Sequence, residues 1–130
     1  MWRLASLAYA VLVIGACLVP AEAETVSFVC SRTQADQANL IRLGYPTTAE
    51  TVMHITIDTD ARTAADLATY PGDSSGHTPT VYPATITSEL VTWSTPPDED
   101  GDKATRYFNR NTKTLNTVDP MGSSTMWDCA

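Results

Sequence analysis

Short stretches of alternating apolar and polar residues dominate the chain, the pattern of β-strands that bury one face. We expect strands over residues 25–30, 52–58, 81–93, 104–109, 113–118 and 125–129. The stretch at 81–93 is long enough for one bent strand or two, with Pro83 marking an edge or the start of a strand. These stretches are rich in Val, Ile and Thr, which favour strands. The pattern predicts a mainly β domain, a small antiparallel barrel or sandwich of about 6–8 strands.

Two segments of eight residues resemble each other and predict tight hairpins. Residues 57–64 and 108–115 each run from an apolar residue through Asp or Asn to a basic residue and Thr. Asp and Asn tolerate left-handed backbone and bond to their own backbone, as turns require. We interpret the pair as two similar hairpins and not as a duplicated binding site.

One stretch has helical spacing. Thr33 and Asp36 suit a helix start, while Gly44 and Pro46 suit its end. We therefore expect one short helix over residues 34–43.

The first residues have the composition of a signal peptide. A basic start is followed by an uncharged apolar run over residues 4–18, too short to span a bilayer comfortably. Small residues before Glu24 predict cleavage after Ala23, leaving residues 24–130 as one periplasmic or secreted domain. An alternative is a lipoprotein, because residues 14–17 resemble a lipobox with Cys17 as the lipidated residue. We find no other stretch apolar enough for a transmembrane helix.

After cleavage, two cysteines remain, one near each end of the domain. Cys30 alternates in phase with Phe28, and Cys129 with Trp127, so both face the interior of the predicted strands. We expect a buried disulfide between the first and last strands. Closing a loop of about 100 residues is worth roughly 4–5 kcal/mol in the chain-entropy description.

The charge of the chain limits its partners. The chain contains eight Lys and Arg residues and fifteen Asp and Glu residues, which gives a net charge of −7. Nucleic acids and anionic membranes reward clustered cations, so neither is an expected partner. Acidity keeps a secreted domain soluble, and it would also attract a basic partner protein.

Residues with distinctive chemistry are few. Three aromatic residues could line a ligand-binding mouth or pack in the core: Tyr82, Trp93 and Tyr107. Asp98, Asp100 and Asp102 alternate and are candidates for a cation site. They lack the spacing and the distal Glu of a calcium loop, so we interpret them as an acidic turn and expect no metal or other cofactor.

We also expect no catalytic site. His54 lies on an outward strand face, where a lone histidine is usually a surface residue. His77 follows Asp73, Ser74 and Ser75 in a loop rich in Gly and Ser, and such a loop does not hold catalytic geometry.

The layout resembles a class of small secreted bacterial β-proteins with a cysteine near each end. The resemblance is carried by a cysteine in the first strand, by the ITID stretch at 55–58, by a strand ending in Trp93, by the YFNRNTKTL hairpin at 107–115 and by the closing WDC at 127–129. In its size, its disulfide and its β content, the chain is also distantly similar to the periplasmic inhibitors of C-type lysozyme, which are small antiparallel barrels.

Together these features predict a non-enzymatic binding or interaction module of the cell envelope. One alternative is an inhibitor of a basic enzyme that attacks the envelope, such as lysozyme, which the acidity favours. Another is a carrier of a small ligand with an apolar barrel interior.

Overall fold

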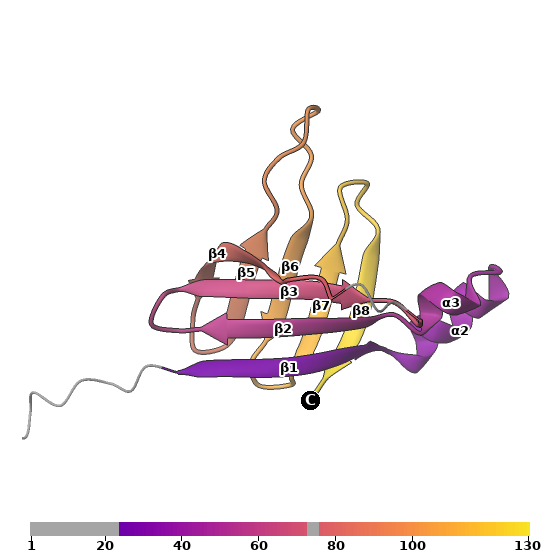
Figure 1. Cartoon of the computed structure of the whole chain (residues 1–130), viewed down its shortest axis with the longest axis horizontal. Coiled ribbons are helices and arrows are strands. Elements are labelled where there is room, and N and C mark those ends of the chain that lie inside the picture. Colours follow the sequence, from indigo (N-terminus) through magenta and orange to yellow (C-terminus); the bar gives the residue numbers. More distant parts are fainter. Residues whose placement is uncertain (1–23, 73–75) are drawn as a thin grey trace, which may run out of the picture.

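The protein is a closed antiparallel β-barrel of eight strands (Figure 1). The computed structural model describes residues 24–72 and 76–130; the predicted signal peptide (1–23) and residues 73–75 lie outside the described residues. The strands are β1 (Thr25–Arg32), β2 (Val52–Asp58), β3 (Thr63–Thr69), β4 (Thr80–Ile86), β5 (Leu90–Ser94), β6 (Thr105–Asn109), β7 (Thr114–Val118) and β8 (Ser124–Cys129). Each strand pairs with the next, and β1 pairs with β8. The predicted mainly β fold is confirmed, as a barrel and not a sandwich.

The predicted disulfide closes this barrel. Cys30 and Cys129 lie directly opposite each other on β1 and β8, with their Cα atoms 4.0 Å apart. The neighbouring pair, Val29 and Ala130, exchanges both backbone hydrogen bonds. The two cysteines therefore occupy a non-hydrogen-bonded pair, where opposite side chains come closest. The bridge also connects the ends of the domain, across 99 positions in sequence.

Alternation along the strands fills the middle of the barrel with apolar side chains. Among the described residues, the largest fully buried side chains are those of Phe108, Ile55, Leu115, Val91 and Cys30. Phe28 packs against Phe108, with ring centroids 4.9 Å apart. The faces expected from the sequence are confirmed in β2, where Met53, Ile55 and Ile57 are buried and His54 is exposed.

The two ends of the barrel differ because neighbouring strands alternate in direction. The connections β2–β3, β4–β5 and β6–β7 are tight and lie at one end. The longer connections lie at the other end, and they include two helices and the loops that extend beyond β5–β6 and β7–β8 (Figure 1). We call this second end the mouth of the barrel.

The two predicted hairpins are confirmed and share their turn chemistry. Asp58 Oδ1 accepts hydrogen bonds from the backbone N–H groups two and three residues later, and Asn109 Oδ1 does the same. Each turn ends in a basic residue with left-handed backbone, Arg62 at φ 54° and Lys113 at φ 56°. The repeat is therefore a repeat of turn geometry.

The expected helix is present as α2 (Gln34–Arg42), capped by Thr33 and followed by Gly44 at φ 89°. The expectation of a single helix was wrong, since α3 (Pro46–Ala49) follows. Pro46 takes the first turn of α3, where its missing N–H costs nothing. None of the helices in the described residues is long and apolar enough to span a membrane.

Two further details differ from the sequence predictions. Strand β3 was not among the strands expected from alternation, because it is rich in Ala and contains Asp66, although the predicted 57–64 hairpin requires a strand after its turn. It forms because β2 and β4 supply backbone hydrogen-bond partners on both sides.

The 81–93 stretch divides into β4 and β5, and Pro83 lies inside β4. The pairing of β4 passes from β3 to β5 at this proline, so its missing N–H falls at the junction.

Replacing Lys113 with Gly should stabilise the barrel. Left-handed backbone strains a residue with a Cβ, whereas glycine adopts it freely, so K113G should raise the free energy of unfolding by about 0.5–1 kcal/mol. Urea denaturation followed by Trp fluorescence measures the change. K113A is the control, because it removes the same side chain but keeps the strain. Equal stabilities of K113G and K113A would contradict the prediction.

Candidate functional site

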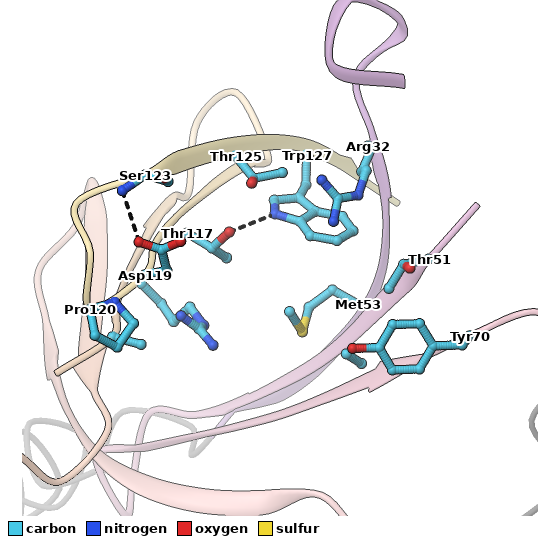
Figure 2. Close-up of a pocket in the computed structure, with 13 residues that line it drawn as sticks. Arg32, Thr51, Met53, Tyr70, Thr117, Asp119, Pro120, Ser123, Thr125 and Trp127 are labelled. Carbon is cyan, nitrogen blue, oxygen red and sulfur yellow. Dashed lines mark hydrogen bonds between the residues drawn. The ribbon is translucent and has the colours of Figure 1, made fainter. Parts of the chain in front are cut away.

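A hollow of about 400 Å³ opens at the mouth of the barrel (Figure 2). Its lining comes from β1, β2, β3, β6, β7, β8 and the loops that follow or precede them. Unlike the apolar middle of the barrel, this lining is largely polar and contains two arginines, Arg32 and Arg106. Figure 2 shows Arg32, Thr51 and Tyr70 along one side of the hollow, with Asp119 and Pro120 on the other.

Arg32 enters the hollow from the seam between β1 and β8. It lies two residues after Cys30 and therefore on the same inward face, directly opposite Trp127 in the register of the pair. Its guanidinium carbon lies 4.9 Å from the centre of a Trp127 ring, a cation–π contact. The Trp127 indole N–H donates to Thr117 Oγ1 at 3.0 Å, which orients the ring (Figure 2).

Burial acts on the charge of Arg32. Desolvation lowers the pKa of the guanidinium below its ordinary value, because burial disfavours the charged form. The electrostatic influence of Asp36, followed by that of Tyr70, acts in the opposite direction on this pKa. Arginine stays protonated in proteins. The hollow thus holds a cation that has lost part of its hydration.

Arg106 enters from β6 and is held by an inward carboxylate. Its Nε lies 3.4 Å from Asp66 Oδ2, and the two side chains are only 16% and 11% exposed. The same oxygen accepts a hydrogen bond of 2.7 Å from the Trp93 indole N–H. Asp66 therefore compensates the charge of Arg106 and satisfies Trp93 in the barrel interior.

Three buried polar atoms that lack a hydrogen-bond partner belong to residues that line this hollow. Within residues 24–72 and 76–130, the buried side-chain nitrogen and oxygen atoms without such a partner are Arg32 Nε, Thr51 Oγ1 and Arg106 Nε. All three residues line the hollow. The contact between Arg106 Nε and Asp66 has the distance of an ion pair but not the geometry of a hydrogen bond. Buried polar groups are normally satisfied by the protein or by ordered water, so each exception requires an explanation, such as a bound water, ion or ligand.

Two other hollows lack this combination. One of about 410 Å³ lies on the outer wall of β4, β5 and β6, lined by Thr, Ser and Pro residues together with Trp93 and Tyr107. The other, of about 280 Å³, lies at the tight-turn end beside Phe28 and Phe108. Neither includes a residue with an unsatisfied buried polar atom. The mouth is therefore the strongest candidate site.

The structure separates the three aromatic candidates. Trp93 is 3% exposed in the core, and Tyr82 packs against the same core from β4. Tyr107 points outward and is 41% exposed. None of these three residues lines the mouth, whose aromatic residues are Trp127 and Tyr70.

The three aspartates of the acidic turn do come together. Asp98, Asp100 and Asp102 are exposed, and one potential ligand atom from each lies within 4.8 Å of the others. However, Asp98 Oδ1 already accepts the backbone N–H groups of Asp100 and Asp102, both at 2.9 Å. These hydrogen bonds stabilise the turn and explain why the three aspartates lie close together.

The histidines lie outside the mouth. His54 Nε2 lies 3.3 Å from Thr69 Oγ1 on the outer wall of the barrel. His77 is exposed in the β3–β4 connection, and its possible partners Asp73, Ser74 and Ser75 lie outside the described residues.

The polar residues of the mouth were missed from the sequence, although a signal for them existed. Arg32 continues the inward phase of Phe28 and Cys30, and Arg106 shares the inward phase of Phe108. A charged residue at an inward position of a strand is unusual and points to a functional or paired site. Thr51 carries no such signal, because it precedes β2.

Comparison with known proteins leaves the function to be inferred from these residues. The chain matches no protein family, no curated protein and no solved structure.

The Asp66–Arg106 pair makes a testable contribution to stability. Asp66→Asn keeps an acceptor for the Trp93 indole but removes the charge beside Arg106, so it should lower the free energy of unfolding by about 2–4 kcal/mol. The double variant D66N/R106Q should be more stable than the sum of the single effects predicts, because neither charge is then left alone. Urea denaturation with the disulfide intact measures all three variants. Additivity within about 0.5 kcal/mol would contradict the pairing.

Proposed function

We propose that the protein is a non-enzymatic binding module of the cell envelope that holds a small polar ligand in the mouth of its barrel. The observation that carries the proposal is that the three residues with an unsatisfied buried polar atom all line one hollow of about 400 Å³. Hollows of this size accept small molecules, and a few well-placed polar groups orient the ligand.

The cell envelope is proposed from the export signal expected in residues 1–23, together with the disulfide. Disulfides persist in oxidising compartments, and the Cys30–Cys129 bridge is compatible with one.

The interior of the barrel favours a ligand at the mouth over an apolar ligand in the centre. Large side chains such as Phe108, Ile55 and Leu115 occupy the middle and are almost fully buried. An apolar carrier would need that space for its ligand. The polar lining of the mouth instead offers hydrogen bonds and charge.

A substitution that fills the mouth tests the proposal. Ala68 lines the hollow and faces inward from β3, so Ala68→Leu should exclude ligands by occupying their space. A panel of amino acids, monosaccharides and organic acids would be screened by ¹H–¹⁵N NMR, with the Trp127 indole and the Thr51 amide as reporters. At least one compound should shift both signals, and A68L should weaken its binding about 10-fold or more, as expected for lost contacts worth 1.4 kcal/mol.

Ala65→Leu is the matched control for A68L. Ala65 lies on the same strand, opposite Thr56 on the outer face, so the added side chain does not enter the hollow. The proposal fails if no compound shifts the mouth signals, or if A65L and A68L weaken binding equally.

A second candidate function is inhibition of a basic enzyme, such as C-type lysozyme. The observation that favours it is the β5–β6 connection, which projects from the barrel (Figure 1) and exposes Asp98, Glu99, Asp100 and Asp102. Such a loop complements a cationic cleft.

An activity assay tests this second candidate. Under the inhibitor hypothesis, a molar excess of the protein should slow cell-wall hydrolysis by a C-type lysozyme, more strongly at low salt. E99Q/D100N should inhibit less, since it removes two charges and leaves the turn-forming Asp98 intact. An unchanged lysozyme rate at molar excess would end this hypothesis.

A further inference from the structure

The charged side chains that line the mouth are mostly cationic, although the chain as a whole is acidic. The chain as a whole carries a net charge of −7. The charged side chains that line the hollow are instead two arginines, Arg32 and Arg106, and a single carboxylate, Asp119. An anionic group in the hollow would meet both guanidinium groups, of which that of Arg106 also contacts Asp66.

We infer that the mouth binds the oxyanion group of a small molecule, a carboxylate or phosphate, between Arg32 and Arg106 with Thr51 as a third donor. This inference rests on the proposed function and names the chemistry of its ligand. The guanidinium group has only donors, in a planar fork that matches the two oxygens of a carboxylate or phosphate.

The unsatisfied atoms are the main support. Arg32 Nε and Arg106 Nε are both buried donors without a hydrogen-bond partner, although Arg106 Nε also forms the 3.4 Å ion-pair contact with Asp66. Both arginines line the hollow. Thr51 is 4% exposed, and its hydroxyl is likewise unpaired. A hydroxyl can also donate a hydrogen bond to an oxyanion. One acceptor-rich group would satisfy all three atoms, and a charged acceptor would form the strongest bonds with them.

The nearby carboxylates are already engaged with other groups. Asp119 Oδ1 accepts the backbone N–H groups of Met121 and Ser123 at 2.9 and 2.8 Å. Asp36 Oδ2 accepts the N–H of Met126 at 2.6 Å. Asp66 interacts with Arg106 from within the barrel, and its hydrogen bond to Trp93 orients it there. These contacts give each of the three carboxylates a partner within the protein.

The desolvation of Arg32 also favours an anionic ligand. Its charge is partly removed from water and rests on the face of Trp127, which stabilises a cation but supplies no hydrogen-bond acceptor. An oxyanion would compensate this charge at the point where water is excluded. Charge-assisted hydrogen bonds are roughly twice as strong as neutral ones.

Matched pairs of neutral and anionic compounds test the inference. Glucose is compared with glucuronate and glucose 6-phosphate, and glycerol with glycerol 3-phosphate, which separates carboxylate from phosphate. Each is titrated into the ¹⁵N-labelled protein, with the Trp127 indole, the Thr51 amide and the Arg32 Nε–H as reporters. We expect an anionic member of a pair to bind at least about 10-fold more tightly than its neutral counterpart, as for one hydrogen bond to a charged group.

Two variants connect this preference to the named residues. Arg32→Gln and Thr51→Val should each weaken binding of the preferred anion, R32Q by about 10-fold or more. T51V should also unfold at the same or a higher temperature without ligand, because it replaces an unpaired buried hydroxyl with a methyl group of similar size. A merely structural Thr51 would instead lose stability. Arg62→Gln is the control, since it removes one exposed positive charge at the other end of the barrel.

The outcomes separate this inference from the proposed function. If neutral and anionic compounds shift the mouth signals with equal affinity, or if R32Q and R62Q bind the anion equally, the oxyanion inference is wrong and the binding function stands. If no compound of this set or of the wider panel shifts those signals, both are wrong. Anion-selective binding that R32Q and T51V weaken, and R62Q does not, supports both.

Discussion

Closure of the sheet between β1 and β8 is the constraint on which the rest of the barrel depends. The register of the two strands covers three residues each, Cys30–Arg32 with Trp127–Cys129, and Val29 and Ala130 add two backbone hydrogen bonds beside it, whereas β1 and β2 pair over seven residues. The two strands of this seam come from opposite ends of the domain. A covalent bond at its first pair removes chain entropy from the unfolded state, worth about 4–5 kcal/mol for a loop of this length. Without closure, both strands would be sheet edges.

The same seam builds part of the candidate site. Two residues beyond Cys30 the chain places Arg32 inward, and two residues before Cys129 it places Trp127 inward, directly opposite. The contact between the guanidinium and the indole is therefore a consequence of the register that the disulfide fixes. Thr33 and Asp36 extend the attachment, since they bond the backbone of Met126 and tie the start of α2 to β8. The position of Arg32 is thereby preorganised, as a binding site requires.

The barrel divides its interior between stability and binding. Its middle contains closely packed apolar side chains, and its tight-turn end is fixed by Asp58 and Asn109, which bond their own backbones. The mouth contains charges and unpaired polar atoms, which cost stability unless a ligand satisfies them. The long connections gather at that same end, an arrangement in which a rigid scaffold supports variable loops.

The elements that follow from local chemistry could be predicted from the sequence. Alternation identified most strands and their inward faces, and the Asp and Asn turns identified two hairpins. Thr33 and Gly44 marked the ends of α2. Strand β3 could not be predicted in this way, because its Ala-rich segment has no strand preference of its own and forms only between two neighbours. The candidate site was missed for a similar reason: Arg32, Thr51 and Arg106 are separated along the chain and meet only when the sheet closes.

The sequence by itself therefore determined a disulfide-linked, mainly β domain of acidic charge, since strand phase, turn residues and cysteine positions act over short distances or as simple pairs. Only the tertiary structure decided that the sheet closes into a barrel, that Asp66 compensates Arg106, and that three unpaired polar atoms share one hollow. The physical reason is that these features depend on distances between strands and on the exclusion of water, which exist only once all eight strands are in place.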